Sequence, residues 1–474
     1  MNITKLKKNL ATIILLFADI LLLLVIFEAA KAIRIYILPH FLTLPPFHHK
    51  TINYIWIFVI YIIIFFYKKL YNKTFPFWDE IKNIIESITI AAIIILFIFF
   101  IGKISTVYSR TLIITYNVLL ILLFPAIRLP IRKLLYKSGL FIKKALIIGS
   151  STLAESIYQS IKNEPNLCYK ISGFIDDLKT KKEIEGNKIH SGLNKIESYI
   201  KIAHITDVII AKEDFSSKDL SSFINRIQHK AENVIYVPDI KGIAAYGTEI
   251  KYFFNQQTIA FEIKNNLSNI TNYITKRVID YIFSILIFFL ILPIIIIIAI
   301  LIKFTSEGSI IYSHKRIGKN GKEFNCYKFR TMYKDADEKL KEILESDPEK
   351  KKEWETYWKL NDDPRITPIG KFLRKTSLDE IPQIFNILKG EMSLVGPRPV
   401  VQREIDEYYK ENADYYFKVP PGITGLWQVS GRSSVSYEYR VLLDSWYVKN
   451  WNLWLDIVIL LKTIKAVIKQ EGAR

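Results

Sequence analysis

Two adjacent carboxylates, Asp379 and Glu380, stand in the segment TSLDEIPQ, between a basic stretch (370–375) and a turn-rich one (390–399). Acidic side chains at a helix N-terminus are stabilised by the helix dipole and can hold a divalent metal. Arginines beside them can bind phosphate. The segment also fits an ordinary capping box, with Ser377 as the N-cap and Glu380 reaching back to it. Taken alone, the segment leaves both interpretations open.

Basic side chains in neighbouring segments are suited to phosphate groups. Arg330, Arg398 and Arg432 each follow or occupy a turn-prone stretch, and a guanidinium group can bind two phosphate oxygens at once. For each arginine singly, a structural salt bridge is an equal alternative. Further candidates for the phosphate of a lipid substrate, or for its neighbours, are Lys276, Arg277 and Lys328.

The order and spacing of motifs from about Lys276 to the C-terminus resemble those of a known enzyme family. The motifs are YSHKRIGKNGKEFNCYKFRTM (312–332), TSLDEIPQ (376–383), VGPRP (395–399), PPGITGLWQVSGR (420–432) and LLDSWYVKNWNLWLD (442–456). The series is similar to that of the bacterial sugar transferases. It most resembles the polyisoprenyl-phosphate hexose-1-phosphate transferases of the undecaprenyl-phosphate galactose or glucose type.

The resemblance implies transfer of a hexose 1-phosphate from a UDP-sugar to undecaprenyl phosphate, with release of UMP. This would be the first membrane step of capsule, exopolysaccharide or O-antigen (lipopolysaccharide) synthesis. By resemblance, Asp379 attacks the β-phosphorus and forms a phosphosugar-enzyme intermediate, which divides a reaction between two anions into two steps. Glu380 would help to hold Mg²⁺, with Mn²⁺ as the alternative ion, and Asp444 is a second candidate for a metal or structural role. The sugar stays open between galactose, glucose and an N-acetylated hexose.

Composition indicates a membrane protein with soluble parts. Half of the 474 residues are hydrophobic, and they are gathered into runs too long and too uncharged for globular cores. The net charge of +19 suits a protein that lies against anionic lipid and handles phosphate esters. No nucleic-acid motif accompanies this charge, so the expected partners are bilayer lipids, undecaprenyl phosphate and a UDP-sugar. Cys168 and Cys326 lie far apart in the chain and are expected to be reduced.

Four apolar runs predict a transmembrane region over residues 1–135. The segments expected inside carry more lysine and arginine than the outer loops, which places both ends of this region in the cytoplasm. We therefore expect a multi-pass protein of the bacterial inner (cytoplasmic) membrane whose soluble domains face the cytoplasm. Asp19 is a functional candidate because an acid inside a span is costly, although it could simply bind a neighbouring helix. The runs cover residues 10–30, 53–67, 87–102 and 111–127.

Short β-runs alternating with helices predict a Rossmann-like α/β domain over residues 140–262. Its first turn, GSSTLA, keeps only Gly149 of the dinucleotide fingerprint, so no nicotinamide cofactor is expected. Asp176 and Asp177 could meet a ribose hydroxyl, but a surface turn is the favoured interpretation. The domain also offers a surface for a homodimer.

Two alternative functions remain open. A membrane-anchored nucleotide-sugar dehydratase or epimerase would also combine apolar spans with such an α/β domain, but it would need the intact glycine fingerprint. A non-catalytic scaffold for polysaccharide assembly would not need the complete series Asp379, Glu380, Arg330 and Arg398.

An α-rich catalytic domain is predicted over residues 270–474, and it begins with an uncharged run at residues 281–302. The run is long enough to cross a bilayer, but Pro293 stands near its middle and should break or kink a helix. A crossing helix would carry every later motif to the outside, where no nucleotide-sugar is available. We therefore expect a re-entrant helix that breaks at Pro293 and returns, with a spanning helix as the alternative.

Overall fold

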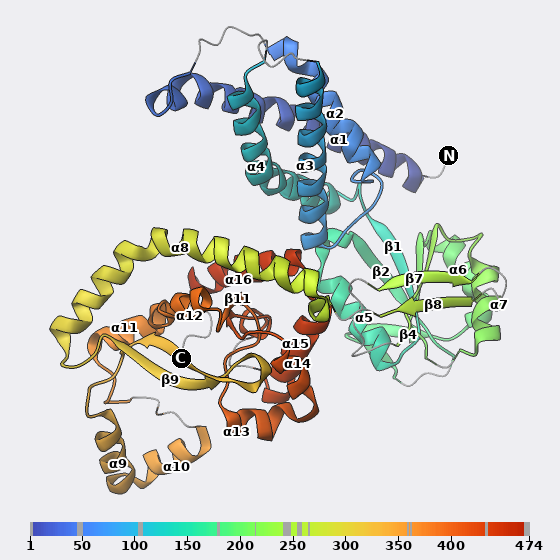
Figure 1. The fold of residues 1–474 in the computed structure, drawn as a ribbon. Coiled ribbons are helices and arrows are strands. Elements are labelled where there is room, and N and C mark those ends of the chain that lie inside the picture. The colour runs from blue at the N-terminus through green and yellow to red at the C-terminus, as the bar shows by residue number, and fades with distance from the viewer. Residues whose placement is uncertain are drawn as a thin grey trace. The chain divides into compact units, whose positions relative to one another are not determined.

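The computed structural model describes residues 3–44, 51–102, 108–177, 181–213, 215–239, 248–253, 258–263, 266–357, 360, 363–431 and 435–468. The chain divides into two compact units, Met1–Ile240 and Lys241–Arg474. The first unit contains a helix bundle and an α/β domain, and the second contains the motif-rich C-terminal part (Figure 1). We describe each unit by itself.

The four predicted N-terminal helices are present. They are α1 (Ile3–Ala32), α2 (Ile55–Tyr67), α3 (Phe77–Ile101) and α4 (Arg110–Lys137). Among the described residues, four helices are long and apolar enough to cross a membrane, and these are Asn9–His40, Phe77–Ile101, Arg110–Lys137 and Ile270–Thr305. The 13 residues of α2 extend only about 20 Å at 1.5 Å per residue, which is less than the roughly 30 Å of a hydrocarbon core.

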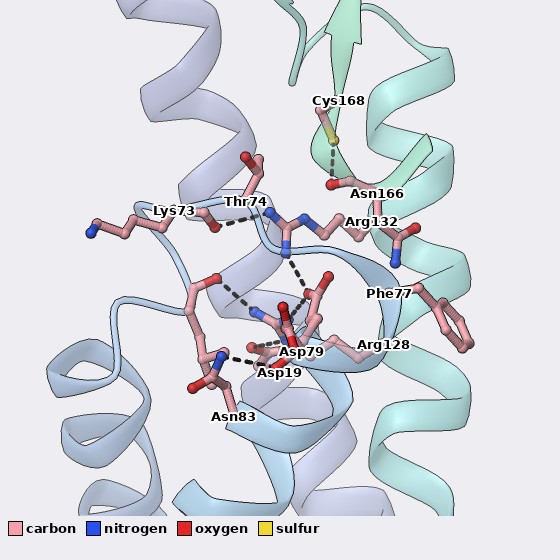
Figure 2. Close-up of polar contacts among 12 residues, drawn as sticks. Asp19, Lys73, Thr74, Phe77, Asp79, Asn83, Arg128, Arg132, Asn166 and Cys168 are labelled. Carbon is pink, nitrogen blue, oxygen red and sulfur yellow. Dashed lines mark hydrogen bonds and ion pairs between the residues drawn. The ribbon is translucent and has the colours of Figure 1, made fainter. Parts of the chain in front are cut away.

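Buried charges join three helices of the bundle (Figure 2). Arg128 of α4 donates from Nε to Asp19 Oδ2 of α1 at 3.0 Å and from Nη1 to Glu80 Oε1 of α3 at 2.7 Å. Arg132, one turn later, also contacts Glu80, and all four side chains are buried. Asp19 is therefore an internal partner of Arg128. Arg128 and Arg132 are thereby withdrawn from solvent.

The α/β domain is built on a six-stranded sheet of order β3-β4-β2-β1-β5-β6. Strands β4, β2, β1, β5 and β6 pair in parallel, and only β3 runs antiparallel to its neighbour β4. The strands are β1 (Lys143–Ile148), β2 (Tyr169–Ile175), β3 (Glu183–Ile184), β4 (Asn187–His190), β5 (Asp207–Ile210) and β6 (Asn233–Tyr236). The accompanying helices are α5 (Thr152–Asn163), α6 (Ile196–Ile202) and α7 (Ser217–Ile227). The expected α/β content is therefore present.

The turn after β1 serves packing inside this domain. A Cβ added to Gly149 would lie 2.3 Å from the carbonyl oxygen of Ala211, so only glycine fits the close approach of the two strand ends. Asp176 is buried and accepts from Ser150 Oγ at 2.6 Å and from Lys212 Nζ at 2.9 Å. The interpretation of Asp176 as a surface turn residue was wrong, because its carboxylate is held inside by these two partners.

The second unit begins with the hairpin of β7 (Glu249–Phe253) and β8 (Thr258–Glu262), which the sequence had assigned to the α/β domain. Helix α8 (Ile270–Thr305) and the hairpin of β9 (Ile311–Ile317) and β10 (Glu323–Phe329) follow. Strands β11 (Ser393–Val395) and β12 (Gly422–Thr424) pair in parallel. The remaining helices are α9 (Ala336–Ser346), α10 (Pro348–Tyr357), α11 (Pro368–Thr376), α12 (Gln383–Lys389), α13 (Gln402–Glu404), α14 (Ala413–Phe417), α15 (Tyr437–Asn450) and α16 (Leu453–Ile468).

Helix α8 stays helical through Pro293 over its whole length of 36 residues. Figure 1 shows it as one bent ribbon, so the expected break is not an interruption of the helix. Most of its apolar side chains are exposed, yet it contacts the rest of the unit near its start, middle and end. Asp280 accepts from Ser393 Oγ at 2.6 Å, Phe288 packs against Phe385 of α12, and Ile302 lies in a buried cluster with Phe329 and Leu373.

Candidate functional site

The acidic pair lies in a short 3₁₀ turn, Leu378–Glu380, between α11 and α12. Ser377, which ends α11, has a φ of 57° and makes no side-chain capping hydrogen bond. The capping-box alternative was therefore wrong. The left-handed conformation of Ser377 reverses the chain after α11, and this reversal presents Asp379 and Glu380 just before α12 begins.

Lys328 of β10 stands between the two carboxylates. Its Nζ donates to Glu380 Oε1 at 2.7 Å and lies 3.7 Å from Asp379 Oδ2. Burial raises the pKa of the Asp379 carboxyl; Lys328 opposes this rise, Glu380 adds to it, and Arg374 opposes it. A partly desolvated carboxylate beside a specific charged partner is the kind of group found at reactive sites.

Glu380 borders a small pocket that opens to solvent and is also lined by Lys328, Gln383, Arg398 and Arg316, among others. Asp379, its neighbour in the chain, lies outside this lining. Arg398 is exposed, and its guanidinium carbon lies 5.8 Å from the ring centre of Trp427. Three cationic side chains thus converge on a pocket that also contains a carboxylate. Such a set can bind phosphate oxygens directly, and the carboxylate can share a divalent cation with them.

Arg330 lies outside this pocket lining. It follows β10 in the chain and contacts the residues just after α8. Its Nη2 donates to Ser306 O and to Ser306 Oγ, both at 2.8 Å. A Cβ added to Gly308 would lie 2.1 Å from Arg330 Nη1, so the guanidinium fills the space beside that glycine. In this placement Arg330 holds the turn that follows α8.

Lys276, predicted to bind phosphate, lies instead in a buried polar network. Its Nζ is 2.8 Å from Asp456 Oδ2 of α16 and 3.7 Å from Asp280 Oδ2. Tyr447 also donates to Asp456, at 2.7 Å. Arg277, the neighbouring candidate, donates to Met392 O at 2.8 Å. Both side chains therefore attach α8 to the rest of the second unit.

Asp444 of α15 is also separate from the pocket lining. It is 2% exposed and accepts from Tyr409 Oη at 2.8 Å. Burial raises its pKa to about 7, although the Tyr409 hydrogen bond acts in the opposite direction. Within the described part of the chain, no group of three His, Cys, Asp or Glu side chains is placed to hold a metal ion. The structural role weighed for Asp444 fits this position better than the metal role.

The raised pKa of Asp444 predicts that Asp444→Asn stabilises the protein at alkaline pH. Between about pH 4 and pH 7 the folded state keeps a proton on Asp444 that the unfolded state has lost, so stability falls as pH rises through this window. The full effect is up to ~4 kcal/mol. Melting temperatures in detergent should be higher for Asp444→Asn than for wild type at pH 8, and the difference should shrink towards pH 5. The exposed Asp414→Asn is the matched control, and a difference independent of pH would contradict the prediction.

Two predicted residues remain. Pro293 lies within α8, and Arg432 lies outside the described residues. The sequence reasoning missed Arg316 and Gln383, which line the pocket, and Asp280, which anchors β11. Spacing offered a signal for two of them. Asp280 follows Lys276 by four residues, and Gln383 follows Asp379 by four.

The first unit has membrane-length apolar helices, and the second unit has a pocket that is lined by three cationic side chains and by Glu380. These features are those of a membrane protein with a cationic pocket. A family model described as "Bacterial sugar transferase" matches residues 271–470, and one described as "CoA-binding domain" matches residues 70–238. The chain belongs to the bacterial sugar transferase family, which confirms the resemblance seen in its C-terminal motifs.

Individual relatives agree with this assignment. An uncharacterized sugar transferase of Haemophilus influenzae is 42% identical over 406 residues, which cover 85% of each chain. The undecaprenyl-phosphate galactose phosphotransferase of Salmonella typhimurium is 39% identical over 417 residues, covering 86% of this chain and 85% of that protein. A UDP-glucose:undecaprenyl-phosphate glucose-1-phosphate transferase of Klebsiella pneumoniae is 30% identical over 332 residues, covering 68% of this chain and 67% of that protein.

Proposed function

We propose that this protein transfers a hexose 1-phosphate from a UDP-sugar to undecaprenyl phosphate, releasing UMP, at the start of exopolysaccharide, capsule or O-antigen synthesis. The observation that carries the proposal is the Asp379–Glu380 pair, held by Lys328 beside a pocket lined by arginines. The names of the relatives, which act on galactose or glucose donors and undecaprenyl phosphate, support the reaction class.

In the proposed first step, an Asp379 carboxylate oxygen attacks the phosphorus that carries the sugar. The bond from this phosphorus to the bridging oxygen breaks, and UMP leaves with that oxygen. In the second step, a phosphate oxygen of the lipid attacks the same phosphorus and displaces the Asp379 carboxylate. Because attacking group and substrate are both anionic in each step, the charges of Lys328 and Arg398 lower the electrostatic cost of approach.

A divalent cation, Mg²⁺ or Mn²⁺, would bind at Glu380. Mg²⁺ is commonly held by one or two protein carboxylates together with substrate phosphates, and Glu380 is the carboxylate lining the pocket. The bound ion would neutralise charge on the phosphate oxygens. The salt bridge from Lys328 holds Glu380 at the pocket lining.

A radiolabelled donor assay tests the proposal. Purified protein in detergent or membranes is incubated with undecaprenyl phosphate and a panel of labelled UDP-galactose, UDP-glucose and N-acetylated UDP-hexoses. Label appearing in lipid, together with UMP, is the expected result and also identifies the sugar. An altered nucleotide-sugar would instead indicate the dehydratase or epimerase, and no product with any donor would favour the scaffold.

We further propose that α8 enters and leaves the membrane on the cytoplasmic side, so that both soluble parts face the cytoplasm. The contacts of α8 support this arrangement. Lys276 near its start pairs with Asp456, and Ile302 near its end packs with Leu373 of α11, which is itself a basic helix. Holding both ends against one polar unit is difficult for a helix that crosses a bilayer. Pro293, which lacks a backbone donor, lies in the bent helix and favours the return.

Cysteine labelling in intact cells tests this topology. We expect Thr271→Cys, in the first turn of α8, and Lys322→Cys, beyond its end, both to be shielded from an impermeant external thiol reagent. Phe41→Cys, in a loop expected outside, is the positive control. Wild type is the background control because its two cysteines are buried. External labelling of Lys322→Cys would show that α8 crosses, and the cytoplasmic mechanism would then be wrong. The homodimer expected through the α/β domain stays a prediction.

A further inference from the structure

Gln383 is the one polar residue of the pocket lining for which the proposed mechanism gives no role and which has no partner of its own among the described residues. It is the first residue of α12 and is only 2% exposed, yet it lines the pocket beside Lys328, Glu380 and Arg398. Buried polar side chains in native proteins nearly always have a hydrogen-bond partner. The small exposed part of Gln383 faces the open pocket, so a molecule bound there can supply the partner that the amide lacks.

The chemistry of the amide differs from that of its neighbours. Lys328, Arg316 and Arg398 can only donate and carry positive charge, while Glu380, as a carboxylate, can only accept. Gln383 is neutral and offers both N–H donors and a carbonyl acceptor. Phosphate oxygens need donors alone, and the cations already supply them. A hydroxyl group, which both donates and accepts, matches the amide.

The position of Gln383 decides which part of the UDP-sugar it can contact. Gln383 lines the same pocket as Glu380, and Asp379 adjoins Glu380 in the chain, so Gln383 lies close to where the proposed reaction occurs. The phosphorus attacked by Asp379 carries the hexose directly, whereas the uracil is separated from it by the second phosphate and the ribose. The hexose is therefore the hydroxyl-bearing group closest to Gln383.

We propose that Gln383 hydrogen-bonds a hydroxyl group of the hexose during transfer and helps to select the sugar. The inference rests on the proposed hexose-phosphate transfer. Gln383 contacts the substrate but forms and breaks no bond, so it acts as a specificity-determining residue. The apolar side chains that share the pocket lining, such as Ile423 and Pro399, provide a surface for the ring itself.

The test combines Gln383→Met, which removes both hydrogen-bonding groups at nearly constant size, with UDP-hexoses that lack single hydroxyl groups. In wild type, removal of one particular hydroxyl should lower kcat/KM about 10-fold to 100-fold. With the unmodified UDP-hexose, Gln383→Met should lower kcat/KM by a similar factor. With the deoxy UDP-hexose, its kcat/KM should fall no further. Gln402→Met, at an exposed position of α13, should behave like wild type throughout.

Several outcomes would overturn the proposal. If wild type is active but removal of no single hydroxyl lowers its kcat/KM, Gln383 does not recognise the hexose. The same conclusion follows if the deoxy UDP-hexose lowers kcat/KM as much in Gln383→Met as in wild type. If Gln383→Met instead weakens inhibition by UMP and leaves the deoxy pattern unchanged, the amide contacts the nucleotide. If wild type transfers no hexose phosphate from any donor, the proposed function itself fails. The wild-type deoxy series needs no variant, so it decides the question even if Gln383→Met does not fold.

Discussion

Asp379→Asn is expected to abolish sugar-phosphate transfer, with a loss of at least about 10⁴-fold, because an amide is a poor nucleophile towards phosphorus. The substitution hardly changes the size of the side chain. It removes one of the two carboxylates beside Lys328, while Glu380 still pairs with that lysine at 2.7 Å. Folding should therefore be preserved. The measurement is transfer of label from the UDP-sugar identified in the donor panel to undecaprenyl phosphate.

Single-turnover labelling separates a lost nucleophile from a damaged pocket. Without lipid acceptor, wild type should retain labelled sugar phosphate on the protein and release one equivalent of UMP. Asp379→Asn should do neither. Glu380→Gln keeps the nucleophile and should still become labelled, although more slowly, and Asp414→Asn serves as the surface control. Turnover near the wild-type rate by folded Asp379→Asn protein would remove Asp379 from the mechanism.

Lys276→Met should destabilise the second unit by about 3–5 kcal/mol, the cost of removing one partner of a buried ion pair. The ammonium of Lys276 lies 2.8 Å from Asp456 and 3.7 Å from Asp280, and all three side chains are buried. Without the lysine, two carboxylates would face each other with no cation between them. In detergent, the thermal unfolding temperature of Lys276→Met should be much lower than that of wild type.

Two variants control this experiment. Lys276→Arg keeps the charge and should recover much of the stability, and Lys465→Met removes an exposed lysine from α16 and should have little effect. The alternative is the phosphate-binding role first expected for Lys276. A variant with unchanged unfolding but a raised KM for undecaprenyl phosphate would restore that role.

The difference between Lys276 and Lys328 shows what the sequence could predict about the site. Both lysines lie in the part of the chain that resembles the family, and both were expected near phosphate. The partner of Lys276, Asp456, is 180 positions away in the chain, and no local pattern reveals such a pairing. A lysine pairs equally well with a phosphate and with a carboxylate, so residue type alone does not distinguish a binding cation from a structural one.

Fold prediction succeeded where one physical signal dominates. The apolar runs located the four N-terminal helices, because a lipid-facing helix must be apolar along most of its length. Their ends were less accurate. Helix α3 begins at Phe77, ten residues before its predicted start at position 87, since its first turn carries Asp79 and Glu80. Hydropathy therefore missed the polar start of α3, which supplies Glu80 to the buried cluster.

That cluster also affects how the bundle is assembled in the membrane. Asp19 lies within the first candidate span, and its partner Arg128 is 109 residues later in the chain. A nascent chain inserts α1 before α4 has been made. Asp19 therefore lies in the membrane, or at its edge, before Arg128 is present to pair with it. An unpaired aspartate at the centre of a span costs roughly 2.5–3.5 kcal/mol on insertion scales. When α4 inserts, Arg128 pairs with Asp19 and removes this cost. The complete bundle is therefore stabilised relative to an incomplete set of helices.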